Sequence, residues 1–478
     1  MSHISIRSRF SKSFLREFYQ DLREAIGGSE KDFTKIPLSK SIVLLSIPMV
    51  LEMIMESVFA LVDIFFVSRL GAEAVATVGI TESLMTIIYA IGIGLSVGTT
   101  AMVSRRIGEK KPEEAAVAAV QAIFTGIVAS LAFSAVGIFF AKDLLRLMGA
   151  SEATIEMGFM YPTIMLGGNM VIMLLFIINA VFRSSGDAAI SMRVLWFANI
   201  LNIVLDPLLI FGIGPFPELG IKGAAVATNI GRGVAVVYQL YLLGKGKYRV
   251  KVRARQIVIR VKEVTKLVKL SLGAIGQYLI ATSSWIFLVW VVTSLGEEVV
   301  AGYTIAIRIV MFALLPSWGL ANAAATLVGQ NLGAEQPDRA ERSAWVVGIG
   351  NMVFLGLISI IFIAVPDSFI SFFIDGTEEP MVLHSGVTCL RVVSFGFLIY
   401  AMGMVMINSI NGAGDTATPV WINFIAFWLM EIPLAYVFTK VLNLHINGVC
   451  YAILIGEAAL TFIAITIFKR GRWKLKKV

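Results

Sequence analysis

The sequence predicts an all-α integral membrane protein in which twelve transmembrane helices form two parallel six-helix lobes related by an internal repeat. Composition, charge distribution and that repeat carry the prediction. The 478 residues are 57% hydrophobic and only 15% charged, whereas soluble proteins usually have about 25% charged residues. Uncharged stretches at 115–141, 270–296 and 345–366 each exceed the roughly 20 residues that cross a bilayer core.

The apolar stretches and the polar segments between them place the helices. We expect helices at 41–68, 74–104, 114–141, 154–182, 188–213, 220–243, 266–294, 299–329, 343–365, 380–408, 416–439 and 446–468. The chain then divides into a basic amphipathic N-terminal tail (1–40), an N-lobe (41–244), a basic cytoplasmic linker (245–265), a C-lobe (266–468) and a basic C-terminal tail (469–478).

The basic residues predict the orientation of these helices. With the N-terminus inside, 32 of the 40 Lys and Arg residues fall in inner segments and 5 in outer loops. Such an excess fits the positive-inside rule, and it favours an even number of helices in a plasma membrane with both termini cytoplasmic. The net charge of +8 is therefore topological, and we expect no nucleic-acid partner.

The N-terminal tail has a pattern of its own. Phe10, Phe14 and Phe18 recur every fourth residue, with Leu15 and Leu22 nearby and basic residues between them. This spacing favours an amphipathic helix on the inner leaflet that ends at the Gly27-Gly28 pair. A solvated tail with incidental aromatic residues is the alternative.

The internal repeat is the most informative feature of the organisation. Residues 46–115 align without a gap on 271–340, so that Gly108 and Pro112 match Gly333 and Pro337. The shift from position 46 to position 271 spans six predicted helices, and an even number of crossings returns the second copy in the same orientation. Two parallel lobes of this kind suit alternating access to a central cavity, and hence transport.

Several motifs in both lobes resemble the multidrug and toxic compound extrusion (MATE) family. The resemblance rests on Pro48 and on the segments 61–79 (LVDIFFVSRLGAEAVATVG), 105–115 (RRIGEKKPEEA), 329–340 (GQNLGAEQPDRA), 183–187 (RSSGD), 201–212 (LNIVLDPLLIFG) and 220–228 (GIKGAAVAT). It implies efflux of varied, often cationic compounds, driven by inward flow of protons or sodium ions. Asp63 with Asn202 and Asp206 resembles the DinF-like branch.

The polar residues of the N-lobe predict where ions couple to transport. Asp63, Asp206, Thr228 and Tyr161 lie at similar depths in four predicted helices, and Asn202 shares a helix face with Asp206. Intramembrane acids are costly and usually functional. The C-lobe counterpart of Asp63 is Leu288, and the predicted helix at 266–294 that contains it has no acid. We therefore expect a coupling site in the N-lobe only.

Two chemistries remain open for this site. Oxygen atoms of Asp63, Asn202, Asp206 and Thr228, with a carbonyl freed by Pro207, suit a sodium ion. Two nearby carboxylates in a low dielectric equally suit a proton. In the structural alternative, Asp206-Pro207 only caps or bends the helix and backbone groups satisfy Asp63.

The first predicted helix, 41–68, carries further residues that could take part in transport. Glu52 and Glu56 share a stripe with Asp63, and they fit either a proton path or an attraction for cationic substrate, or else ion pairing and snorkelling. Pro48 removes a backbone hydrogen bond, and it predicts a hinge or, alternatively, a static kink. In the C-lobe we expect Arg308, Arg391, Glu431 and Glu457 to form a structural charge-paired network.

The chain shows no P-loop, HExxH or GxSxG motif, so we expect neither an enzyme nor a cofactor. Cys389 and Cys450 lack metal or disulfide spacing. The favoured function is a secondary antiporter, working as a monomer, whose partners are small organic, often cationic substrates and membrane lipids. The alternatives are a flippase for a lipid-linked substrate and, less favoured, an intramembrane lipid enzyme.

Overall fold

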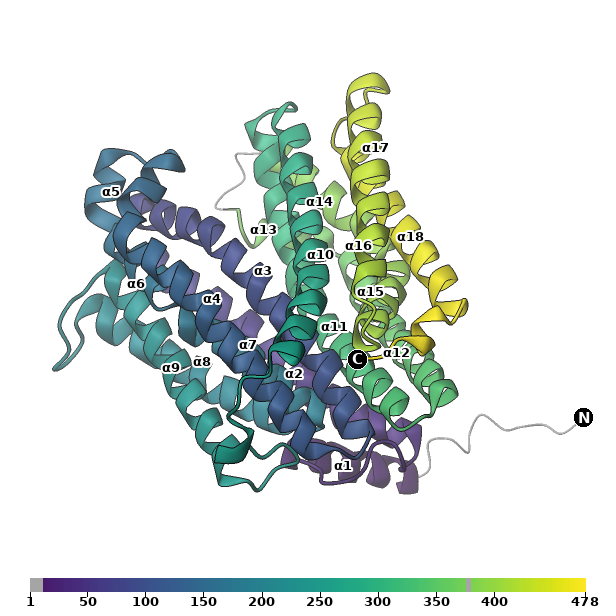
Figure 1. Ribbon diagram of the computed structural model, residues 1–478. Helices are drawn as coiled ribbons and strands as arrows, with labels where there is room; N and C mark the ends of the chain where they lie inside the picture. Colours follow the sequence, from purple (N-terminus) through teal and green to yellow (C-terminus); the bar gives the residue numbers. More distant parts are fainter. Residues whose placement is uncertain (1–11, 375–379) are drawn as a thin grey trace, which may run out of the picture.

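The computed structural model describes residues 12–374 and 380–478, and within them the chain is helical, with no strand (Figure 1). The first half contains α1 (Lys12–Gly27), α2 (Leu38–Ser68), α3 (Ala72–Gly108), α4 (Pro112–Leu147), α5 (Glu152–Gly158), α6 (Met160–Gly167), α7 (Asn169–Ser185), α8 (Ala188–Phe211) and α9 (Ile221–Lys245).

The second half repeats this order after the short helix η2 (Ala254–Gln256). It contains α10 (Val261–Thr293), α11 (Glu297–Gly333), α12 (Pro337–Ala364), α13 (Pro366–Ser371), α14 (Pro380–Phe395), α15 (Phe397–Gly412), α16 (Ala417–Asn423), η3 (Phe424–Glu431), α17 (Ile432–Tyr436), η4 (Val437–Val441), α18 (His445–Lys469) and η5 (Arg472–Leu475). The segments η3 and η4 are π-helical.

The predicted fold class is confirmed. Over the described residues, nine helical spans are long and apolar enough to cross a membrane, and the pair α14–α15, bent by 57°, makes a tenth. The remaining two of the twelve expected helices are α2 and α9, which are long but carry ionisable side chains at Glu52, Glu56, Asp63 and Arg232. The protein is thus a multi-pass membrane protein.

Three expected helices are less regular than their sequence suggests. The helix expected at 154–182 is divided into α5, α6 and α7, and α9 packs so closely here that a side chain on Gly168 would meet Asn229. The helix expected at 380–408 bends at Gly396. The helix expected at 416–439 contains two π-helical segments, with Pro433 between them. Each departure depends on a neighbouring helix or a local backbone change, which apolar spacing does not encode.

The repeat extends to the backbone of the loops. Gly71 and Gly296, which the repeat aligns with each other, have φ angles of 100° and 114°. Lys110 and Glu335, aligned by the same shift, have φ angles of 61° and 58°. These left-handed conformations are uncommon for residues other than glycine, so their recurrence shows that the two lobes share their loop geometry.

The lobes meet at one end of the molecule and diverge toward the other (Figure 1). We call the first the closed end; it carries the loops 109–111 and 334–336. There the backbones of α3 and α11 touch, since a side chain on Gly108 would meet the carbonyl of Gln330, and one on Gly333 would meet that of Arg105. Gln330 also donates to the carbonyl oxygen of Ser184 at 2.8 Å.

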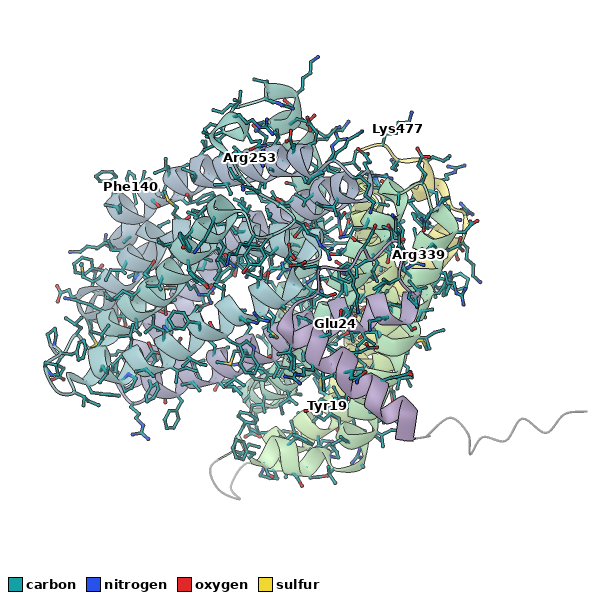
Figure 2. All side chains as sticks on the ribbon, turned by 90° about the horizontal axis from the view of Figure 1, so that it is seen from below. Tyr19, Glu24, Phe140, Arg253, Arg339 and Lys477 are labelled. Atoms are coloured by element: carbon teal, nitrogen blue, oxygen red, sulfur yellow. The ribbon has the colours of Figure 1, made fainter. Side chains whose placement is uncertain are left out.

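The N-terminal helix α1 lies across the closed end (Figure 2). It packs on α2 and α8, burying Ala25 while Tyr19 stays exposed. Asp21 accepts a hydrogen bond from Lys40 at 2.5 Å. Phe10, and the side chains of Phe14, Leu15 and Phe18, lie outside the described part of the chain, so the apolar face of α1 stays a prediction.

Candidate functional site

Three of the predicted site residues meet inside the N-lobe. Asp206 on α8 has an exposed fraction of 0%, and Asn202, one turn earlier, and Thr228 on α9 are also buried. With the Asn202 amide oriented to satisfy its neighbours, its nitrogen donates to Asp206 Oδ2 at 2.9 Å, and its oxygen accepts from the Thr228 backbone nitrogen at 2.9 Å. The other oxygen, Asp206 Oδ1, has no partner.

The helix around this carboxylate does not end or cap there. The helix α8 continues through Pro207 to Phe211, so the alternative in which Asp206-Pro207 caps the helix is not what the structure shows. Because proline has no N–H, the carbonyl oxygen of Ile203, one turn earlier, lacks its usual helical donor. Asp206 Oδ1 therefore lacks any donor, and one turn earlier the carbonyl oxygen of Ile203 lacks its helical donor.

Asp63 and Tyr161 complete the predicted set. Asp63 on α2 is close enough to Asp206 for the two carboxylates to interact electrostatically. Tyr161 on α6, which is 3% exposed, interacts with both. Asp63 makes no hydrogen bond or ion pair among the described residues, so backbone groups do not satisfy it. All five predicted coupling residues thus gather in one region of the N-lobe.

Sequence reasoning missed Glu82, which lies on α3 and interacts with Asp63 and Arg232. Its side chain is exposed, and it also interacts with Tyr278 of α10 in the C-lobe. Glu82 therefore borders the face of the N-lobe that looks toward the other lobe. Its position as an acid inside a predicted membrane helix was the signal that could have identified it.

The two deeper acids of α2 are ion-paired. Glu52, 1% exposed, accepts from Arg183 Nη1 through its Oε1 atom at 2.6 Å. Glu56 accepts from Arg232 Nη2 at 3.1 Å and from Asn199 Nδ2 at 3.1 Å. Of the interpretations left open by the sequence, ion pairing describes both acids.

The helix α2 is continuous through Pro48, which is buried. The following turn packs closely on the C-lobe, because a Cβ atom added at Gly319 of α11 would lie 2.6 Å from the carbonyl oxygen of Met49. The expected hinge thus lies beside a helix crossing between the lobes, and its bending stays a prediction.

The prediction that the charged residues of the C-lobe form a paired network was wrong. Arg391 lies 3.8 Å from Asp367, and Arg308 is exposed. Glu431 and Glu457 form no ion pair within the described residues. The two arginines and the two acids are therefore separate features, because the side of a helix on which a charge lies does not follow from its depth alone.

The described residues contain no group of three His, Cys, Asp or Glu side chains that could hold a metal ion. A sodium ion at the N-lobe site would therefore depend on two carboxylates together with amide, hydroxyl and carbonyl oxygens. Cys389 and Cys450 are buried free thiols.

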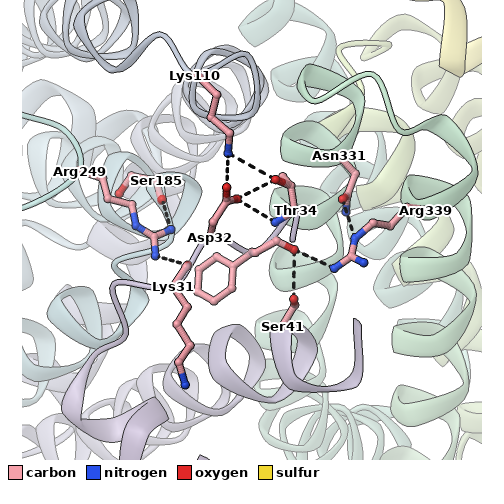
Figure 3. Close-up of polar contacts among 10 residues, drawn as sticks. Lys31, Asp32, Thr34, Ser41, Lys110, Ser185, Arg249, Asn331 and Arg339 are labelled. Atoms are coloured by element: carbon pink, nitrogen blue, oxygen red, sulfur yellow. Dashed lines mark hydrogen bonds and ion pairs between the residues drawn. The ribbon is translucent and has the colours of Figure 1, made fainter. Parts of the chain in front are cut away.

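A segment outside the membrane helices ties the lobes together at the closed end. We call it the strap, residues 28–37 (Figure 3). Arg249 of the linker donates to the carbonyl oxygens of Ser29 and Lys31 at 3.0 and 2.6 Å. Arg339 of α12 donates to the carbonyl oxygens of Phe33 and Ile36 at 3.0 and 2.5 Å. The strap thus bridges N-lobe and C-lobe segments.

The strap also carries an ion pair. Asp32 lies 2.6 Å from Lys110 Nζ and accepts from the Thr34 hydroxyl at 2.7 Å. Burial opposes ionisation of Asp32, but hydrogen bonds from Lys110 and Thr34 outweigh it and lower the pKa of the carboxyl from 3.8 to about 2. The aspartate therefore stays charged throughout the physiological pH range.

Comparison with known proteins places the chain in a family. A family model described as MatE matches residues 48–208 and 274–437. The chain is 25% identical to a probable multidrug resistance protein NorM of Thermotoga maritima, over 92% of this chain and 94% of that protein. It is 28% identical to a FAD transporter of Shewanella oneidensis, over 86% and 90% of the two chains.

A solved structure agrees over the same length. The outward-facing conformation of a multidrug resistance MATE family transporter has a TM-score of 0.85 with this chain at 26% identity, covering 92% of this chain and 96% of the other. The likeness covers both lobes, and it supports the arrangement of twelve helices.

Proposed function

Because the chain belongs to the MatE family of membrane transporters, we propose that it is a secondary antiporter that exports varied, often cationic small organic compounds in exchange for protons or sodium ions. The observation that carries the proposal is Asp206, a fully buried carboxylate with one unpartnered oxygen beside Asp63. An isolated charge in such a place is costly, and a bound cation offsets that cost.

The geometry suggests how ion binding becomes movement. Asp63 is on α2 and Asp206 on α8, so their repulsion acts between two helices and is removed when a proton or sodium ion binds between them. A cationic substrate held by exposed carboxylates such as Glu82 favours the other arrangement. Exchange follows when the two cations bias one two-state element in opposite directions.

The orientation belongs to the same proposal. The excess of Lys and Arg in inner segments favours a cytoplasmic closed end in the plasma membrane. The segments near the two ends of the described chain both contact the closed end of α3, which supports their being on the same side of the membrane. Asp32 pairs with Lys110, and the carbonyl oxygen of Lys476 accepts a hydrogen bond from Arg105 at 2.5 Å. The arrangement in Figure 1 is then the outward-facing one.

The relative named as a FAD transporter supports a second candidate, the export of an anionic dinucleotide. The two candidates differ in the charge of the substrate. The acidic residues Asp63, Glu82 and Asp206 favour a cation, because an anion close to them would be repelled.

The test uses inverted vesicles, in which export appears as uptake. We expect a cationic dye to accumulate when the lumen is acidic, or when it is loaded with sodium, and not without a gradient. Accumulation of FAD in place of the dye would favour the second candidate. Dye uptake that is the same with and without the proton and sodium gradients would contradict antiport.

A further inference from the structure

The C-lobe contains two acids that the proposed coupling site does not use. Glu431, the last residue of η3, is 3% exposed, and its Oε2 atom has no partner. Glu457 on α18 is partly exposed as a residue, but its Oε2 atom is enclosed and also unpartnered. The two carboxylates are close enough to interact, and neither accepts a hydrogen bond from a described residue.

The repeat relates this pair to the N-lobe site. A Cβ atom added at Gly231 of α9 would lie 3.3 Å from Asn202 Cβ. The shift that aligns Gly108 with Gly333 also aligns Gly231 with Gly456 of α18. A Cβ atom at Gly456 would lie 2.8 Å from Glu431 Cβ and 2.9 Å from its Oε2 atom. Glu431 therefore occupies in the C-lobe the place that Asn202 occupies beside Asp206.

In the part of the chain that the structure describes, no cation interacts with these acids. The elements packed on η3 are α10, α16, α17 and α18, and within their described residues Glu457 is the charged group that interacts with Glu431. Tyr400 of α15 interacts with both acids. The hydroxyl of Tyr303 on α11, a residue 1% exposed, interacts with Glu431 and is itself unpartnered.

We propose that Glu431 and Glu457 form a second proton-binding site, in the C-lobe, in which a proton neutralises one of the two carboxylates and is exchanged during transport. Two ionised carboxylates without a counter-ion are strongly disfavoured in a dry interior, whereas a proton taken from water neutralises one of them and removes their repulsion.

A proton fits this site better than a metal cation. The N-lobe site adds amide, hydroxyl and carbonyl oxygens to its carboxylates, whereas no side-chain amide among the described residues is hydrogen-bonded to Glu431 or Glu457. The π-helical turn that ends at Glu431 is also a feature that is frequent at functional sites.

The first test does not need transport. We expect the infrared spectrum of the purified protein to contain a carboxylic-acid C=O band that shifts in D₂O and is lost in both Glu431→Gln and Glu457→Gln. Glutamine has the shape of a protonated glutamate, so both variants should fold. An unchanged band in both variants would overturn the site.

The second test measures the role of the proton, which rests on the proposed function. With one proton fewer per cycle, the limiting dye ratio reached by Glu431→Gln under an imposed pH gradient should fall about tenfold per pH unit. An unchanged ratio would overturn exchange of this proton. Loss of the infrared band in Glu431→Gln, with no gradient-driven transport by the unmodified protein, would uphold the site and contradict antiport.

Discussion

At positions that the repeat aligns, each lobe has a hydrogen-bonded pair of side chains between two helices, and the pair is charged in the N-lobe but neutral in the C-lobe. In the N-lobe, Glu52 on α2 binds Arg183 at the end of α7 at 2.6 Å. In the C-lobe, the repeat counterpart of Glu52 is Gln277 on α10, which exchanges two hydrogen bonds with Asn411 of α15, at 3.1 and 3.0 Å. One fold therefore accommodates an ionic or a neutral pair between the same two helices.

The neutral pair shows that charge is not needed to join these helices. A buried ion pair is weak evidence for stability, since desolvation offsets much of its attraction. We infer that Asp63, the acid of α2 that has no ion pair among the described residues, serves transport, whereas Glu52 and Glu56 are held by their arginines. At the C-lobe position that matches Asp63, the chain has Leu288, fully buried in an apolar core.

The largest effect is expected from the site itself. Asp206→Asn should abolish gradient-driven export, because an amide cannot take up or release the coupling ion, while the protein still inserts and folds. The measurement is dye uptake in inverted vesicles, and Asp143→Asn, at an exposed acid, is the matched control. Full activity of both Asp206→Asn and Asp63→Asn would remove the N-lobe coupling site.

The next effect concerns the ionic pair. Arg183→Met leaves Glu52 charged, buried and alone, so it should lower stability by about 3–5 kcal/mol. The double variant Glu52→Gln, Arg183→Asn copies into the N-lobe the neutral Gln–Asn pair of the C-lobe. It should therefore recover most of the stability that Arg183→Met loses. Thermal unfolding in detergent is the measurement, and a double variant as unstable as Arg183→Met would break the comparison.

A smaller effect is expected at the neutral pair. Asn411→Ala leaves Gln277 with fewer partners in a buried place, at a cost of about 1–3 kcal/mol. The same thermal measurement should therefore rank Arg183→Met below Asn411→Ala. The reverse ranking would show that the ionic pair contributes less than the amide pair.

The smallest effect is expected from the strap. The pKa of Asp32 is lowered from 3.8 to about 2. The stability that its ion pair contributes is therefore present above the ordinary pKa of 3.8, and it is lost as the pH falls from there through about 2. Asp32→Asn should therefore lower stability by at most about 1 kcal/mol, since the pair with Lys110 is partly exposed. It should leave the shape of the transport–pH profile between pH 5 and 8 unchanged; a changed profile would assign pH sensing to the strap.

Much of the fold could be predicted because its signals are local. Uncharged stretches, Lys and Arg placement and the internal repeat indicate helices and their order. The gathering of Asp63, Asn202 and Asp206 followed from depth along helices that were placed within a few residues. These signals depend on the chain alone, not on how one helix is rotated against another.

The rest depends on such rotations and on contacts between distant segments. The pairing of Glu56 with Arg232 and the position of Glu82 follow from which faces of the helices meet, and an apolar helix with little periodicity does not indicate them. The bend at Gly396 and the strap contacts likewise depend on neighbours far away in sequence.

The central claim is that substrate and coupling ion compete through the N-lobe carboxylates. The most direct measurement is cation release from the purified protein when a cationic substrate is added, followed with a pH indicator in weak buffer or with radioactive sodium. We expect release from the unmodified protein and from Asp143→Asn, and none from Asp206→Asn. Equal release from Asp206→Asn would contradict the account.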